Sequence, residues 1–182
     1  MKKVVYLAVA MLFAASVVFA QAGSIGIFGD PMGTDCNLQD LVPGLCTYHV
    51  VHVNSPGATA CQFWAPVPAC FLGTYLSDTA LYPVTIGNSQ TGVAVGFGAC
   101  IPSPNNVLDI SFFCQGLTGS CCYYQILPDP AVPSGQIEVV DCVNNLIFAT
   151  GGEGIINADG SCQCDVPAED STWGKVKSLY AE

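Results

Sequence analysis

The protein has 182 residues, of which 51% are hydrophobic and 10% charged, and its formal net charge at pH 7 is −10. The chain has 4 Lys+Arg residues, all lysine, so it cannot neutralise a phosphate backbone, and we exclude nucleic acid as a partner. Low charge combined with a high apolar content also argues against intrinsic disorder.

The N-terminus has the pattern of a secretory signal peptide. A basic start, MKK, precedes residues 4–19, which are apolar apart from one serine. This run is shorter than the ~20 residues that usually span a bilayer. Small side chains allow cleavage after Ala20 or after Ala22, so we assign residues 1–22 to a cleaved signal peptide. We expect export to the periplasm or the extracellular space, without stable membrane insertion.

Removing this segment leaves an acidic chain that is nearly free of cations. The only remaining basic side chains apart from two histidines are Lys175 and Lys177, which stand against 14 acids, a net charge of −12. Internal ion pairs in most of the chain can therefore involve only His49 or His52. We expect stability to come from apolar burial, backbone hydrogen bonds and cross-links.

Cysteine is abundant and confined to the exported part of the chain. An exported protein meets an oxidising compartment, so disulfides are the expected state and an odd number leaves one thiol over. That thiol is either free and buried or linked to a second chain. The 11 cysteines are Cys36, Cys46, Cys61, Cys70, Cys100, Cys114, Cys121, Cys122, Cys142, Cys162 and Cys164.

Sequence alone does not give the disulfide connectivity, but two features suggest local choices. Cys61 and Cys70 flank a proline-containing loop, which favours a local bridge between them. The vicinal pair 121–122 could bond to the closely spaced Cys162 and Cys164. The alternative for these last four residues is a four-thiolate zinc site, although their spacing is not the paired CxxC typical of such sites.

The rest of the chain favours β-structure. Segments rich in β-branched and aromatic residues alternate with Gly, Pro, Asn and Asp turn signals, and several short strands without helical interludes are typical of a sandwich or barrel. The segments around Asn144-Asn145 indicate a hairpin. The expected strands are 24–28, 45–53, 82–86, 93–97, 107–114, 121–127, 137–142 and 146–150.

Only the C-terminus indicates a helix. Ser171 or Thr172 could cap a short helix that ends near Tyr180, with Trp173 and Val176 on the same face as Tyr180. We therefore divide the exported chain into a β-sandwich domain, residues 23–164, and an acidic linker with a short helix, residues 165–182. This helix either docks on the domain or serves as a recognition or sorting tail.

Three segments resemble strands of known β-sandwich modules. VVHVNSPG (residues 50–57), YPVTIGNSQTGVAVGFG (residues 82–98) and VLDISFFCQG (residues 107–116) are similar to successive strands of cohesin-type and carbohydrate-binding-type modules, over about residues 44–116. The C-terminal ending resembles the tails of some secreted bacterial proteins. The resemblance implies an immunoglobulin-like or jelly-roll β-sandwich. The cysteine-rich stretch after Gly116 departs from the cohesin pattern, and no functional residue is carried over.

Carboxylates are the most suggestive polar feature. Because few cations are available to pair with them, carboxylates close together could share a hard ion such as Ca²⁺. Asp30, Asp35 and Asp159 are the candidate ligands, the first two in a cluster with Asp40 and the third near Asn157. The alternative is that these side chains are solvated loop residues. No EF-hand pattern is present, and apart from calcium and the zinc alternative above we expect no cofactor.

The sequence offers little for catalysis. His49 and His52 are three apart, so in a strand they point to opposite faces and cannot share a metal. Motifs typical of zinc proteases, serine hydrolases and nucleotide-binding loops are absent. A small extracellular hydrolase that uses paired carboxylates remains as an alternative function.

Exposed aromatic side chains would indicate sugar binding. Trp64 lies in the proline-rich loop, and together with Phe63 and Tyr75 it forms our candidate binding site for an extracellular glycan or protein. Core packing is the alternative for each of these residues. The leading functional hypothesis is thus a secreted, disulfide-rich, non-catalytic β-sandwich that acts in extracellular binding or as a self-assembling structural subunit. The alternatives are the hydrolase and a calcium-stabilised surface module.

Overall fold

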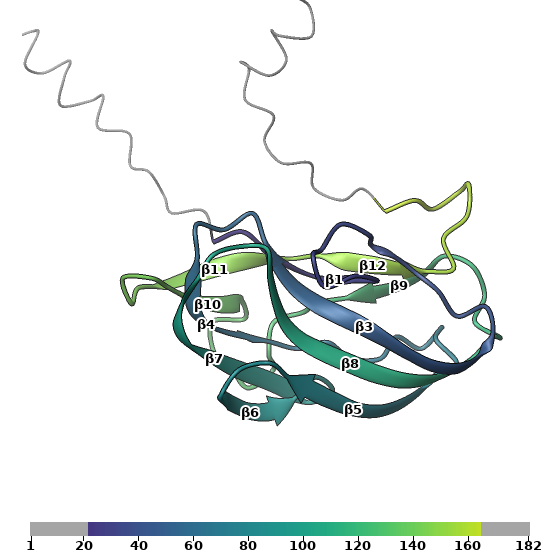
Figure 1. The fold of residues 1–182 in the computed structure, drawn as a ribbon, viewed down its shortest axis with the longest axis horizontal. Helices are drawn as coiled ribbons and strands as arrows, with labels where there is room; N and C mark the ends of the chain where they lie inside the picture. Colours follow the sequence, from purple (N-terminus) through teal and green to yellow (C-terminus); the bar gives the residue numbers. More distant parts are fainter. Residues whose placement is uncertain (1–21, 165–182) are drawn as a thin grey trace, which may run out of the picture.

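The computed structural model describes residues 22–164, and all regular secondary structure in this range is β-strand (Figure 1). The expected all-β class is confirmed. Apart from Ala22, the expected signal peptide lies outside the described residues, as do the acidic linker and the C-terminal helix. Within residues 22–164 no helix has the length and apolar character needed to cross a membrane.

Strands follow one another along the whole described chain. They are β1 (Ser24–Phe28), β2 (Asn37–Leu38), β3 (Pro43–Val53), β4 (Ala58–Phe63), β5 (Thr74–Ala80), β6 (Val84–Asn88), β7 (Gly92–Ile101), β8 (Asn105–Gln115), β9 (Cys122–Gln125), β10 (Ile137–Asp141), β11 (Leu146–Gly151) and β12 (Glu153–Ile156).

These strands form a 9-stranded sheet, order β5-β8-β3-β1-β11-β10-β4-β7-β6, and a 3-stranded sheet, order β2-β12-β9. The larger sheet has two halves that meet only where β1 pairs with β11, in parallel, at Ser24↔Thr150 and Ile25↔Gly151. Its two outermost strands, β5 and β6, lie at the same margin of the molecule (Figure 1). The backbone N–H and hydroxyl of Ser89 donate to the Asp78 carboxylate there, at 2.6 and 2.8 Å.

Alternation along the strands places one row of apolar side chains from each half in a common core. In β8, for example, Ile110 and Phe112 are fully buried whereas Ser111 between them is half-buried. The core holds an aromatic cluster in which Phe71 and Tyr124 meet Phe112 edge-on, at ring-centroid distances of 5.1 and 6.1 Å. The 3-stranded sheet adds Tyr124 and Ile156 to the same core.

Disulfides tie distant parts of this fold together, as the export pattern predicted. The pairs are Cys36–Cys164, Cys46–Cys114, Cys70–Cys122, Cys100–Cys142 and Cys121–Cys162. The bond from Cys121 to Cys162 matches the pairing suggested for the vicinal cysteines. The four cysteines of the proposed zinc site, at positions 121, 122, 162 and 164, all form disulfides, so the zinc alternative is wrong.

The local bridge expected between Cys61 and Cys70 is also wrong. Cys61 lies on β4 and is 3% exposed, and it is the free thiol among the described cysteines. Its side chain belongs to the core, whereas Cys70 is exposed. Cys70 instead reaches Cys122 at the start of β9 and joins that loop to the smaller sheet.

The hairpin expected at Asn144-Asn145 is confirmed as β10–β11. Asn144 has a φ of 65°, which Asn tolerates better than most residues, and the N–H groups of Val143 and Asn145 donate to the Asp141 carboxylate. Four strands were not expected from the sequence: β2, β4, β5 and β12. Two of them, ATACQF and TYLSDTA, contain few β-branched residues, so their pairing depends on neighbouring strands.

Candidate functional site

The aromatic residues proposed for binding do not form one exposed surface. Phe63 is 0% exposed and belongs to the core, so the expectation that it contacts a ligand is wrong. Trp64 is half-buried, and its indole N–H donates to the carbonyl of Gln90 at 2.8 Å. Tyr75 is half-buried as well and packs edge-on against Phe112. Core and loop packing thus accounts for much of what these three side chains do.

Two of the aspartates proposed as calcium ligands, Asp30 and Asp159, instead accept hydrogen bonds within separate turns. Asp30 accepts hydrogen bonds from the backbone N–H groups of Met32, Thr34 and Asp35. Burial alone would raise the pKa of Asp30, but these hydrogen bonds outweigh it and the pKa lies below the usual range. Asp159 accepts from the N–H and the hydroxyl of Ser161, which lowers its pKa in the same way.

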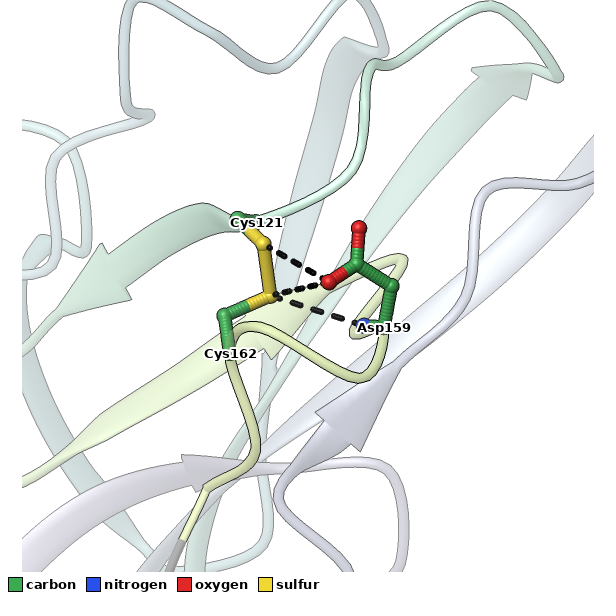
Figure 2. Close-up of side chains that lie close together, drawn as sticks. All are labelled: Cys121, Asp159 and Cys162. Carbon is green, nitrogen blue, oxygen red and sulfur yellow. Dashed lines mark hydrogen bonds between the residues drawn. A yellow bond between two sulfur atoms is a disulfide. The ribbon is translucent and has the colours of Figure 1, made fainter.

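Asp159 belongs to the one group of three potential metal ligands found among residues 22–164. Figure 2 shows it beside the Cys121–Cys162 disulfide, whose sulfurs lie 3.5 and 3.7 Å from its Oδ1 atom. Sulfurs that are bonded to each other are not thiolates and do not ligate a cation as thiolates do. Asp30 and Asp35 are not part of this group, so the structure does not bring the three proposed calcium ligands together.

The two histidines point to opposite sides of β3, as their spacing predicts. His49 faces outward, and its Nδ1 atom lies 2.6 Å from Oδ1 of Asp109 on β8. His52 is 1% exposed and its Nε2 atom lies 2.6 Å from the carbonyl oxygen of Ala22. Because a carbonyl only accepts, Nε2 carries the hydrogen. Burial lowers the pKa of His52, and this hydrogen bond opposes the shift only in part.

The outer face of the half-sheet β11-β10-β4-β7-β6 is the feature that sequence reasoning missed. Strand register aligns two cross-strand rows on this face. The first row is Leu146, Val140, Ala60, Gly96 and Val84. The second row is Phe148, Glu138, Gln62, Ala94 and Ile86.

The size of the side chains varies regularly from the margins of these rows to their centre. Large apolar side chains stand at the two margins: Leu146 and Phe148 on β11 are 54% and 47% exposed, and Val84 and Ile86 on β6 are 53% and 70% exposed. The centre holds small residues such as Ala60, Ala94 and Gly96, together with Val140, Gln62 and Glu138. A shallow groove of about 140 Å³ lies between the margins. We call this surface the apolar groove.

The apolar groove has dimensions that suit one secondary-structure element. Neighbouring strands are about 4.8 Å apart, so the four spacings from β11 to β6 place its margins roughly 19 Å from each other. An α-helix with side chains is about 10–12 Å wide. A single helix therefore fits over the central strands β10, β4 and β7. Glu138, in the floor beside Phe148, supplies the negative charge of the groove.

A signal for this surface exists in the sequence. Strands with one solvated face alternate apolar and polar residues, whereas β7 reads VAVGF and β11 reads LIFA, with apolar or small residues at both phases. Such strands indicate either burial on both faces or an uncovered apolar face. Only the arrangement of the strands in the fold distinguishes these two outcomes.

Comparisons with solved structures return cohesins at low sequence identity. The sixth cohesin of scaffoldin B from Acetivibrio cellulolyticus, solved in complex with a dockerin, is 12% identical with a TM-score of 0.47, covering 75% of this chain and 98% of its own. A non-cellulosomal cohesin from the archaeon Archaeoglobus fulgidus is 11% identical with a TM-score of 0.47, covering 76% and 91%.

A further similar structure is the seventh ScaB type I cohesin from Pseudobacteroides cellulosolvens, which is 14% identical with a TM-score of 0.43 and covers 80% of this chain and 95% of its own. These solved structures are cohesin modules, the class that the strand pattern of residues 44–116 resembles. No protein-family model and no curated protein matches the sequence.

Proposed function

We propose that this protein is an exported, non-catalytic binding module whose apolar groove receives an amphipathic helix from a protein partner. The observation that carries the proposal is the groove itself, a floor of small side chains between two apolar margins. An amphipathic helix laid in a groove is a recurring mode of recognition, with anchors at intervals of three and four residues. The partner helix presents apolar side chains to the margins and to the small residues of the floor, and a basic side chain to Glu138.

Charge supports this choice of partner. The described part of the chain contains no lysine or arginine, and Glu138 lies in the groove floor. Electrostatic complementarity mainly raises association rates and excludes wrong partners. A basic amphipathic helix is attracted to this surface, whereas an acidic one is repelled.

Buried and half-buried acids support a non-catalytic role because they bind the protein's own loops. Asp40 accepts hydrogen bonds from Gly116 and Thr118, and Asp129 accepts from Gln62 and Ala131. These carboxylates fix turns between strands. Export is supported by the disulfides, which indicate that the chain folds in an oxidising environment.

Selection from a display library of random peptides, with the purified exported protein as bait, tests the proposal. We expect the selected peptides to be amphipathic helices with basic residues beside the apolar face. The variant Ala94→Glu puts a longer side chain in the floor and buries its charge under the apolar face of the bound helix, and we expect it to weaken binding about 100-fold or more, equivalent to about 2.7 kcal/mol.

Thr47→Glu is the matched control, because Thr47 is exposed on β3 of the opposite half-sheet. It should leave binding unchanged. Selected peptides without helical periodicity, or equal binding by the Ala94→Glu variant, would contradict the proposal.

A further inference from the structure

Strand β11 has an open edge within the described residues. Its N-terminal part pairs with β10 on one side, through Ile137↔Ala149 and Val139↔Ile147. On the other side β1 pairs only with Thr150 and Gly151. The stretch Leu146–Ala149, which we call the open edge, therefore has a strand neighbour on one side only among residues 22–164.

Hydrogen-bond alternation identifies the free groups on this edge. The N–H of Asp141 bonds to the carbonyl of Asn145, and that of Thr150 bonds to Gly23. Odd-numbered residues of β11 therefore direct their backbone groups to β10, and even-numbered residues direct theirs to the opposite side. Both Leu146 and Phe148 thus present an N–H and a C=O outward from the sheet.

The backbone at Ala22 and Gly23, directly before β1, turns away from this edge. Gly23 has a φ of 74°, so the backbone leaves the direction of β1 at this residue. A Cβ atom there would lie 2.3 Å from the carbonyl oxygen of Val53, so the turn needs glycine. Ala22 then binds His52 of β3 rather than continuing the ladder toward Phe148.

The open edge lacks the devices that usually protect edge strands. Charged residues, prolines and bulges prevent edge-to-edge pairing in most sheets, and residues 143–152 contain no charged residue and no proline. Strand β5 carries Asp78, and β6 follows directly after Pro83. An open hollow of about 1470 Å³ borders the edge, with Ala22–Ser24 and Gln125–Pro128 among its lining residues, so there is room for another strand.

We propose that two copies of this chain pair through their open edges, antiparallel about a two-fold axis, to form one continuous sheet. The axis passes between the two Ile147 residues. Leu146 of each copy then lies opposite Phe148 of the other, and the four free N–H and C=O groups of each copy bond across the junction. The open edge is self-complementary, so the same residues serve both subunits.

Side chains favour this register. Leu146 and Phe148 lie on the outer face at 54% and 47% exposure, and the pairing brings both copies of each into one apolar cluster. The pairing also places the two apolar grooves side by side on a single surface. Strand β11 is held by four residue pairs with β10, so little conformational entropy is lost when a second copy binds.

Charge sets the conditions under which pairing is observed. Each exported chain has a large net negative charge, so two copies repel one another at low ionic strength. Salt at 0.15 M reduces the Debye length to about 8 Å and weakens this repulsion. Dimerisation should therefore strengthen as salt is added, the opposite of an association driven by complementary charges.

Analytical ultracentrifugation of the exported, purified protein over a wide concentration range tests this inference. We expect a monomer–dimer equilibrium that added salt shifts toward dimer. Phe148→Lys and Leu146→Lys should each weaken dimerisation at least tenfold. Ile86→Lys, the same change at an exposed apolar position of β6, should leave it unchanged. A protein that stays monomeric at every concentration and salt level overturns the inference, and so does an equal effect of Ile86→Lys.

Hydrogen exchange distinguishes backbone pairing from contact between side chains alone. On dimerisation, the amides of Leu146 and Phe148 should become protected, whereas those of Ile147 and Ala149 should be protected in both states. Loss of protection at Ile147 in a lysine variant would show that the hairpin has unfolded. Ala94→Glu should weaken peptide binding about 100-fold or more without changing dimerisation, so the failure of one proposal is distinguishable from the failure of the other.

Discussion

At the scale of single residues, polar groups in this protein have mostly internal partners. The described part of the chain has no lysine or arginine, so buried acids bind backbone N–H groups and neutral side chains instead of cations. His52 follows the same principle with a carbonyl acceptor. Because burial disfavours the charged imidazolium, protonation of His52 opposes folding.

Protonation of His52 should make the fold less stable in acid. Above about pH 6.5, the unfolded-state pKa, the imidazole is neutral in both states and contributes no pH dependence. Below that pH the unfolded chain takes up a proton that the folded chain resists, because burial lowers the folded-state pKa. The free energy of unfolding then falls, by about 1.4 kcal/mol for each unit of pKa depression, until the folded pKa is reached.

Urea denaturation between pH 7 and pH 5 measures this loss. The variant His52→Gln, which does not titrate, should show a flatter pH dependence in this range even if it is less stable overall. Equal slopes for the two proteins would contradict the assignment.

At the scale of strands and loops, Asp40 connects segments that are far apart in the sequence. It lies before β3 and is 2% exposed, and its carboxylate accepts from the N–H of Gly116 and the hydroxyl of Thr118, after β8. Asn157, after β12, joins both segments through hydrogen bonds to Asp40 and Thr118. One carboxylate therefore organises one end of the sandwich.

Asp40→Ala should destabilise the protein by about 3 kcal/mol, because it removes hydrogen bonds to a charged acceptor and leaves buried donors unpaired. Chemical denaturation measures the change. Asp35→Ala, at an exposed position, is the control and should cost less than about 1 kcal/mol. A loss below 1 kcal/mol for Asp40→Ala would show that water replaces these contacts.

Most strands could be predicted from the sequence, but their neighbours could not. The β10–β11 hairpin follows from local turn residues, whereas β4 was not predicted because its sequence ATACQF contains few β-branched residues. Local sequence patterns do not show which cysteine of a distant segment lies close enough to form a disulfide. For the same reason Phe63 was assigned to a binding site although it lies in the core, and the apolar groove was missed because it depends on register across five strands.

At the scale of the whole molecule, the disulfides leave one thiol in the core. Burial raises the pKa of Cys61, and the thiolate is the reactive form, so this residue should be inert in the native protein. Without reductant, we expect no thiol to be alkylated in native buffer and one thiol per chain in denaturant, as counted by mass spectrometry. Alkylation of the native protein, or more than one labelled site, would mean that a described disulfide is not formed.

The bond between Cys36 and Cys164 also determines how the protein bears a mechanical load. These cysteines enclose nearly the whole described fold, with a sequence separation of 128. A pull on the two chain ends passes from Cys36 to Cys164 through the covalent bond, and the segment between them carries no tension. Of the described residues, only those before Cys36 lie outside this closure, so stretching acts on β1, the strand that joins the two halves of the larger sheet.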